Sequence, residues 1–368
     1  MKLSDNIKNF DFILFFTVVI ISFLGIVNLL GSLSLNHHEL LNSYVVKQII
    51  WFGISFFVLF AIISIDYNTL IDIAYYIYGV VLILIIIVLI KGKISHGASR
   101  WISLGLFTIQ PSELMKIALI LALAKYFTDA KKKYYKLTDL MIPFLIIIIP
   151  VLLIAKEPDL GTSLIVFFVG CIIVYLSGIK RVSMAIALFF AIVVLPVIWG
   201  HLKTYQKSRI LIFLHPAKAS LGAGYNIIQS EIAVGAGRIL GDGFRHGSQS
   251  ILNFLPAKQT DFIFSTYAQQ FGFIGSIILI GLYFILIIRG FKIVYNTKRL
   301  PAFLLGSGAL FIITLHTVIN IAMAIGLLPV VGVPLPFFSY GGTSLIVDIS
   351  AVAILLNISM RRYKYQSG

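Results

Sequence analysis

Long uncharged apolar runs alternate with short polar segments along almost the whole chain. A helix needs about 20 residues to cross the roughly 30 Å hydrocarbon core of a bilayer. Ten runs approach or reach that length, and the fourth of them is short and begins beside Glu113 and Lys116. In chain order they cover residues 12–30, 45–65, 70–90, 114–127, 140–154, 162–176, 182–199, 262–288, 301–325 and 344–358. The pattern predicts an all-α polytopic integral membrane protein with about ten transmembrane helices.

The composition supports this class. Hydrophobic residues make up 59% of the chain and charged residues 12%, whereas about a quarter of the residues of a soluble globular protein are charged. No low-complexity linker divides the sequence, so residues 1–368 are expected to form a single membrane domain. Cys171 is the single cysteine, which excludes an intrachain disulfide.

Lys and Arg are distributed unevenly over the segments that join the runs. Alternate segments hold 16 of the 29, and cytoplasmic loops of membrane proteins carry an excess of these residues. An even number of spans then places both termini in the cytoplasm. Residues 200–260, between spans seven and eight, are expected to form a large extracytoplasmic loop.

This large loop is basic and rich in glycine. Glu231 and Asp242 are its two acidic residues, against seven cations: Lys203, Lys207, Arg209, Lys218, Arg238, Arg245 and Lys258. Such a charge suits an anionic ligand at the membrane surface, and contact with lipid headgroups explains it equally well. The stretch GAGRILG at residues 235–241 has the spacing GxGxxxG and no βαβ unit around it, which argues against a dinucleotide site.

Ionisable groups near membrane depth are costly and are therefore candidate functional groups. Glu113 and Lys116, three residues apart, can pair on one helix face, and a structural ion pair is the alternative to a site. Asp159 precedes a helical run and has the place of an N-cap, although it could also contact a substrate. His316 and Asn320 lie one helical turn apart and are expected to make hydrogen bonds between helices.

Asp261, in the stretch PAKQTDFIF, stands at the threshold of the eighth apolar run. The nearest opposite charge within one helical turn is Lys258. Desolvation raises the pKa of such a carboxyl group, and nearby cations oppose that shift. A pKa closer to neutrality suits a general base acting on an anionic lipid-linked substrate. A proton-coupled transporter would also need an intramembrane carboxylate, so the residues alone leave both interpretations open.

Five segments resemble the signature blocks of the SEDS family, the shape, elongation, division and sporulation proteins that include RodA and FtsW. In chain order they read SRWISLGLFTIQPSELMK, EPDLGTS, GYNIIQSEIAVGAG, FLPAKQTDFIF and GLLPVVGVPLPFFSYGGTS. The blocks follow the order of the family and extend over most of the chain. The stretches IIQS and GSQSILNFLP are closer to RodA, of cell elongation, than to FtsW.

The resemblance implies a ten-span fold and a peptidoglycan glycosyltransferase. Such an enzyme polymerises lipid II into glycan strands on the outer face of the bacterial cytoplasmic membrane, for wall elongation and cell shape. Its expected partners are lipid II, the nascent strand and a class B penicillin-binding protein that crosslinks the product, with no nucleic acid. A lipid II flippase and a scaffold for that penicillin-binding protein are the alternative functions.

The resemblance also implies roles for particular residues. Asp261 is the expected catalytic base. Cations would compensate the charge of the departing pyrophosphate in place of a general acid. A divalent ion, Mg²⁺ or Mn²⁺, could share that role, and no other cofactor is expected. The family's motifs make Arg100, Trp101, Glu113, Lys116 and Asp159 the expected substrate-binding residues. The charge of the large loop adds Arg209, Arg238 and Lys258, which with Arg100 would hold the pyrophosphates.

The chain departs from the family pattern around that aspartate. Ala257 and Gln259 stand where members commonly have Glu and His, and Gln269 and Gln270 replace an acidic pair. These four positions lack ionisable groups here. Either the family residues at these places are not required for the chemistry, or this protein is tuned differently or depends more on its partner.

Overall fold

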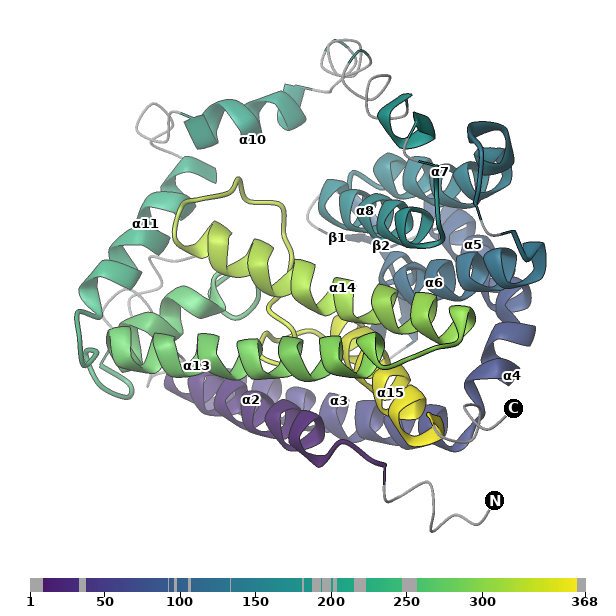
Figure 1. Ribbon diagram of the computed structural model, residues 1–368. Coiled ribbons are helices and arrows are strands. Elements are labelled where there is room, and N and C mark those ends of the chain that lie inside the picture. Colours follow the sequence, from purple (N-terminus) through teal and green to yellow (C-terminus); the bar gives the residue numbers. More distant parts are fainter. Residues whose placement is uncertain are drawn as a thin grey trace.

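The computed structural model describes residues 9–32, 38–91, 93–95, 98–104, 107–132, 134–180, 182–186, 193, 200, 204–214, 223–246 and 257–362. Long helices dominate this part of the chain and pack beside one another (Figure 1). They are α2 (Phe12–Gly31), α3 (His38–Ser64), α4 (Tyr67–Asp72), α5 (Ala74–Lys91), α6 (Pro111–Ala130), α7 (Met141–Lys156), α8 (Leu160–Leu176), α10 (Thr204–Leu214), α11 (Ala223–Ala236), α13 (Ile263–Tyr295), α14 (Leu300–Ala324) and α15 (Gly342–Arg361). A short 3-10 helix, η1 (Leu137–Leu140), precedes α7.

The apolar runs of the sequence correspond to these helices. Within the described residues, six helical segments are long and apolar enough to cross a membrane, and residues 74–90 and 160–176 form shorter apolar helices. The third predicted run is divided at Ile73 between α4 and α5. The seventh, residues 182–199, lies largely outside the described residues. The count of ten spans and the position of the large loop therefore stay predictions.

Helix α6 lies in the interior of the bundle. It contacts α5, α7, α8, α14 and α15, and its residues from Ala118 to Ala124 are buried. The helix carries Glu113 and Lys116 in its first turns. Neighbouring helices shield these charges from lipid, which explains how a short, partly charged run can sit at membrane depth.

The expectation of an all-α chain is wrong for residues 93–95, 98–104 and 107–109. They form a small antiparallel sheet of β1 (Lys93–Ser95), β2 (Ala98–Leu104) and β3 (Phe107–Ile109), in the order β1-β2-β3. Ile102 lies opposite Ile109 in the register of β2 and β3. Aromatic and β-branched residues are enriched here, and such residues favour strands. The sheet connects α5 to α6 and carries Arg100 and Trp101 on β2.

Helix α13 changes direction at Gly272, where φ is 66° and ψ is −163°. A Cβ atom at this position would collide with the backbone of Ile239 and Gly241, so only glycine fits without a shift. Two carbonyl oxygens freed by the break accept hydrogen bonds from the amides of Asp242 and Gly243, at 2.9 and 3.2 Å. The segment after α11 thus provides hydrogen-bond donors for backbone carbonyls that lipid could not satisfy.

The two glutamines that replace the family's acidic pair lie beside this break. Gln270 donates a hydrogen bond to Oδ1 of Asn28 on α2, at 3.1 Å, and Gln269 donates to Oδ2 of Asp242, at 3.2 Å. Both side chains are buried. Here the two positions hold the helix break in place, and a neutral amide can do so without the cost of burying a charge.

Candidate active site at the start of α13

Asp261 lies in the turn that leads into α13, outside the helix itself. The carbonyl oxygens of residues 259–261 accept hydrogen bonds from the amide of Tyr340, the hydroxyl of Ser339 and the side-chain amide of Asn320, at 2.9, 2.8 and 2.9 Å. These donors come from α14 and from the segment between α14 and α15. The backbone that carries the Asp261 carboxyl group is therefore fixed from two sides.

The segment between α14 and α15, residues 325–341, forms one wall beside this carboxyl group. Asn320 uses the same amide nitrogen to donate to the carbonyl of Val333, at 2.8 Å. Gly332 has a φ of 75°, and a Cβ atom there would stand 3.6 Å from Oδ2 of Asp261. Glycine at this position suits the left-handed backbone and leaves space next to the carboxylate.

Charged groups from three other parts of the chain act on Asp261. Burial raises the pKa of its carboxyl group above the ordinary value. A hydrogen bond from the Thr260 side chain and the charges of Arg209 and Arg100 oppose this, while Asp159 adds to it. The residue as a whole nevertheless keeps part of its surface exposed. A reachable carboxyl group with a raised pKa has the properties expected of a general base.

Arg100 reaches the site from β2. Its Nε donates to the carbonyl of Glu157 at 3.0 Å, and its Nη2 donates to the carbonyl of Pro158. These bonds join the small sheet to the connection between α7 and α8. The structure thus brings Arg100 to the site, whereas its neighbour Trp101 is half-buried within β2.

Glu157 contributes a further carboxyl group to this region. Its side chain is fully buried, and neither carboxyl oxygen has a hydrogen-bond partner among the described residues. Burial, then repulsion by Asp159, raises its pKa to about 8, although Arg100 opposes the shift. The residue stands inside the motif EPDLGTS, but nothing in the sequence indicates that its side chain points inward.

Asp159 is the N-cap of α8, as the sequence predicts. Its Oδ1 accepts a hydrogen bond from the amide of Thr162 at 3.3 Å, and its Oδ2 accepts one from Nε2 of Gln110 at 2.7 Å. The first turn of α8 packs closely on the wall segment, because a Cβ at Gly161 would collide with the carbonyl of Val331. Asp159 therefore both caps α8 and joins it to the start of α6.

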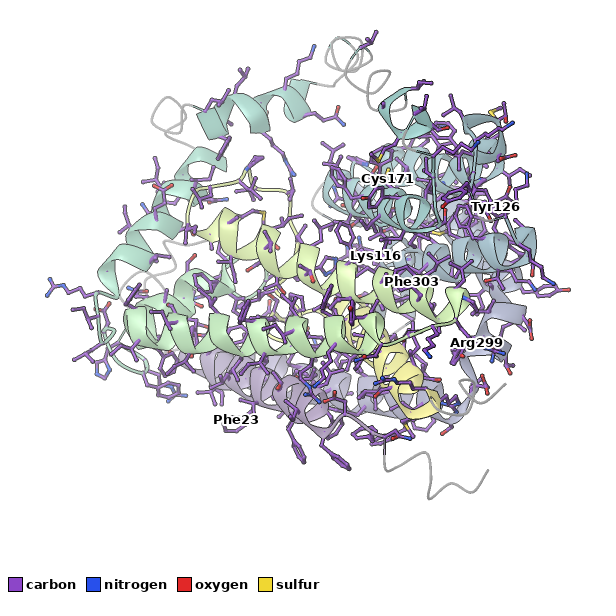
Figure 2. The ribbon with its side chains drawn as sticks, viewed as in Figure 1. Phe23, Lys116, Tyr126, Cys171, Arg299 and Phe303 are labelled. Carbon is purple, nitrogen blue, oxygen red and sulfur yellow. The ribbon has the colours of Figure 1, made fainter. Side chains whose placement is uncertain are left out.

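Glu113 and Lys116 form the predicted ion pair, with 2.7 Å between Oε1 and Nζ. Nζ of Lys116 also lies 2.9 Å from Nε2 of His316, and Nδ1 of His316 lies 3.2 Å from Oδ1 of Asp348. All four side chains are buried, and Figure 2 shows Lys116 deep among the helices. This buried chain links α6, α14 and α15. Its contacts favour a structural role for the pair over direct substrate binding.

The loop cations occupy different places. Arg209, on α10, donates from Nη1 to the carbonyl of Val330 at 3.3 Å and so lies beside the wall segment. Lys258 is buried just before Asp261, and burial lowers its pKa to about 8. Arg238 is exposed after α11, where its carbonyl accepts a hydrogen bond from the amide of Phe273 beyond the break in α13. The structure brings Arg209 to the site, buries Lys258 three residues before Asp261, and leaves Arg238 exposed beside the break in α13.

The fold and the site define a polytopic membrane protein with a partly exposed aspartate on which the charges of two arginines act. Residues 9–364 match the model of the FtsW, RodA and SpoVE family, described as cell cycle protein. The chain is 40% identical over 289 residues to the peptidoglycan glycosyltransferase MrdB of Escherichia coli K12, covering 78% of each protein. The chain therefore belongs to the FtsW, RodA and SpoVE family, which confirms the resemblance seen in the sequence.

Two solved structures share this fold. One is a chain from a study of how a peptidoglycan synthase complex coordinates polymerization and crosslinking. It is 32% identical, with a TM-score of 0.82 and coverage of 96% of this chain and 99% of that one. The other is the rod shape determining protein RodA of Thermus thermophilus, 28% identical, with a TM-score of 0.70 and coverage of 96% and 98%.

Proposed function

We propose that this protein is a peptidoglycan glycosyltransferase that polymerises lipid II into glycan strands, with Asp261 as the general base. Its family and its 40% identity to a peptidoglycan glycosyltransferase support the activity. The environment of Asp261 is the observation that supports its assignment as the general base. A carboxyl group with a raised pKa, on a partly exposed residue whose backbone is fixed and on which two arginines act, suits proton abstraction beside an anionic substrate.

The reaction is a single displacement. The carboxylate of Asp261 accepts the proton of the sugar 4-hydroxyl of an incoming lipid II. The oxygen then bonds to the anomeric carbon of the growing strand, and the bond from that carbon to the pyrophosphate oxygen breaks with its electron pair. An α linkage becomes β-1,4. One carboxylate is enough, whereas glycosidases commonly use two.

The departing pyrophosphate needs positive charge more than it needs a proton. Arg100 and Arg209 act electrostatically on Asp261, so they are close enough to the reacting groups to serve this purpose. Lys258 adds a cation whose pKa burial lowers to about 8. Preorganised cations of this kind stabilise charge that develops in a transition state. Trp101, Glu113, Lys116 and Asp159 shape the surroundings of the substrate, and Arg238 would contact it at a distance from the reacting bond.

A divalent ion, Mg²⁺ or Mn²⁺, belongs to the proposal as a further source of positive charge for the leaving group. No three His, Cys, Asp or Glu side chains converge as a metal site within the described residues. An ion here would therefore take its ligands mainly from pyrophosphate oxygens and water, and Asp159, whose charge acts on Asp261, could contribute a carboxylate oxygen.

The proposed setting is the bacterial cytoplasmic membrane, with both termini in the cytoplasm. The Ser359 hydroxyl donates to the carbonyl of Asn9 at 2.9 Å, so the first and last parts of the described chain lie at one end of the bundle. Asp261 contacts Asn320 near the other end of α14, which supports an extracytoplasmic site. Likeness to RodA and to a chain of a peptidoglycan synthase complex supports a role in wall elongation beside a class B penicillin-binding protein.

Strand formation from lipid II in detergent tests the proposal. The purified protein with its penicillin-binding partner should make glycan strands, and Asp261→Asn should lower the rate by about 10²–10⁴-fold because the base is lost. Asp242→Asn, a neutralised carboxylate elsewhere in the loop, is the matched control. A flippase has no bilayer to act on in detergent, and a scaffold should tolerate Asn at position 261. Equal rates for Asp261→Asn and wild type would exclude the proposed base.

A further inference from the structure

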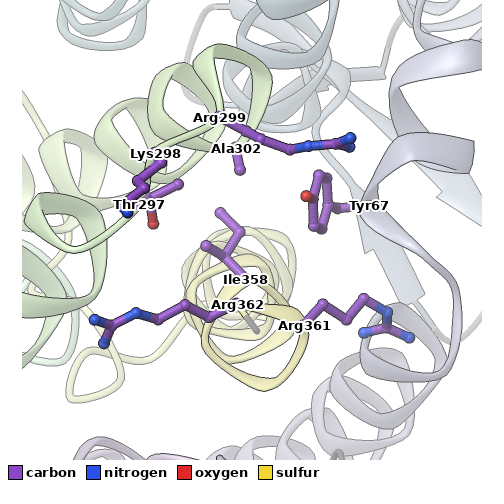
Figure 3. Close-up of a pocket in the computed structure, with 8 residues that line it drawn as sticks. All are labelled: Tyr67, Thr297, Lys298, Arg299, Ala302, Ile358, Arg361 and Arg362. Atoms are coloured by element: carbon purple, nitrogen blue, oxygen red, sulfur yellow. The ribbon is translucent and has the colours of Figure 1, made fainter. Parts of the chain in front are cut away.

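A second polar site lies far from Asp261, between α4, the start of α14 and the end of α15. Figure 3 shows its lining residues, which are Tyr67, Thr297, Lys298, Arg299, Ala302, Ile358, Arg361 and Arg362. Four of these eight residues are cations and none is a carboxylate. Arg299 caps the start of α14 and Asn320 lies near its end, so about 30 Å of helix separates the two sites.

The carboxylates described near this pocket have cationic partners of their own. Oδ2 of Asp66 lies 3.7 Å from Nε of Arg361, while Oδ1 of Asp66 caps α4. Asp11 accepts hydrogen bonds from Nε and Nη2 of Arg289, at 3.1 and 2.7 Å. Neither carboxylate lines the pocket. Asp66 thus offsets one of the four cations that line the pocket, and the excess of cations keeps a positive potential that suits an anion.

Three of the cations differ in exposure: Arg361 forms a buried floor of the pocket, and Lys298 and Arg299 form its exposed rim. Arg361 is buried and donates to Oδ1 of Asn357 and to the carbonyl of Ile63, each at 2.8 Å. Lys298 and Arg299 are exposed in the connection between α13 and α14. They stand beside the first turn of α14, whose free amides add a partial positive charge. Lys298 and Arg299 can thus contact a ligand from the surface, while Arg361 is already held in position beneath it.

Aromatic side chains place this pocket at the level of the lipid headgroups. Phe291 and Tyr295, in the last turns of α13, are 61% and 77% exposed. Their rings stack with centroids 6.0 Å apart. Tyrosine is enriched at the interface between membrane and water, so Tyr295 indicates that level at the end of α13. Ala302 and Ile358 give the pocket an apolar side as well, which a free inorganic anion would not require.

We propose that this pocket binds the phosphate of an anionic phospholipid headgroup. Lys298 and Arg299 contact the phosphate oxygens, Arg361 supplies fixed charge from below, and Ala302 and Ile358 face the glycerol end of the lipid. Basic pockets between transmembrane helices at the cytoplasmic side recognise headgroups in this way. The site is separate from the proposed glycosyltransferase chemistry and does not depend on it.

Native mass spectrometry of the purified full-length protein with phosphatidylglycerol or phosphatidylcholine tests this proposal. The wild type should retain phosphatidylglycerol in preference to phosphatidylcholine. The double variant Lys298→Gln, Arg299→Gln should bind phosphatidylglycerol roughly 25-fold more weakly, about fivefold for each cation removed. Lys180→Gln removes an exposed cation that does not line the pocket and should bind as the wild type does.

Melting temperature in detergent separates lost binding from lost folding. Phosphatidylglycerol should raise the melting temperature of the wild type and of Lys180→Gln, and should leave that of the double variant unchanged. If the double variant already melts early without lipid, the single variant Lys298→Gln takes its place. Equal retention of both lipids, or equal binding by wild type and rim variants, would overturn the proposal. An equal rise with inorganic phosphate alone would overturn it in favour of a free phosphate site.

Discussion

Asp261 and Glu113 are both carboxylates set among apolar helices, yet their surroundings differ. Glu113 is buried in direct contact with Lys116, and that lysine continues to His316 and from there to Asp348. Asp261 is partly exposed and is held through its backbone, and the charges of Arg209 and Arg100 act on it without an ion pair to either among the described residues. Direct pairing compensates a buried charge and makes it structural. Incomplete compensation leaves a proton-binding group available for chemistry.

Removing Lys116 should produce the largest loss of stability. Lys116→Met leaves Glu113 as an uncompensated charge in the buried chain, and breaking such a pair costs about 3–5 kcal/mol. The variant should therefore give little folded protein, judged by size-exclusion elution and melting temperature. The double variant Glu113→Gln, Lys116→Met should be more stable than the single one. A fully stable Lys116→Met with lost activity would instead make Lys116 a substrate-binding residue.

Asn320→Ala should disturb the position of Asp261 without removing a reacting group. The change removes the hydrogen bonds to the carbonyls of Asp261 and Val333, so the carboxyl group is no longer held in position. Rates of strand formation should fall about ten- to 100-fold. The pH at which the rate declines on the acid side should stay the same as in the wild type. Thr314→Val on the same helix, which loses one bond within α14, should keep nearly full activity. Equal activities of these two variants would remove Asn320 from the positioning of the base.

The smallest expected effects on strand formation are those of the two loop arginines, Arg209 and Arg238, and these two effects should differ. Arg209→Gln should lower strand formation about tenfold, since one charge facing the pyrophosphate is lost. Arg238→Gln should stay within about twofold of the wild type, because Arg238 lies on a different surface. The kinetic assay used for Asp261→Asn measures both variants. A larger loss for Arg238→Gln than for Arg209→Gln would mean that the substrate follows another path over the loop.

The sequence indicates much of the local arrangement. Apolar runs locate the helices, and the residue types and spacing around Asp159 and the Glu113–Lys116 pair predict the N-cap and the ion pair that the structure shows. Each of these features depends on neighbours within three residues. The position of Asp261 at the start of an apolar run also follows from the pattern. Local spacing is enough in these cases because a helix fixes the geometry over one turn.

Contacts between distant segments could not be read from the sequence. The partner of Asp348 is His316 on another helix, and the residue that fixes the Asp261 backbone is Asn320, 59 positions away. The inward orientation of Glu157 and the small sheet at residues 93–109 likewise depend on how the helices pack. The charge of the large loop suggests a substrate-binding role for Arg238, but Arg238 is exposed beside the break in α13, away from Asp261.

The pH dependence of strand formation tests the assignment of Asp261 most directly. A base must be deprotonated, so the rate of the wild type should fall as the pH decreases through the pKa of Asp261, which burial raises. The residual rate of Asp261→Asn, measured at high enzyme concentration, should lack this acid limb. An unchanged acid limb in Asp261→Asn would contradict the account and would point to another carboxyl group, first of all Glu157.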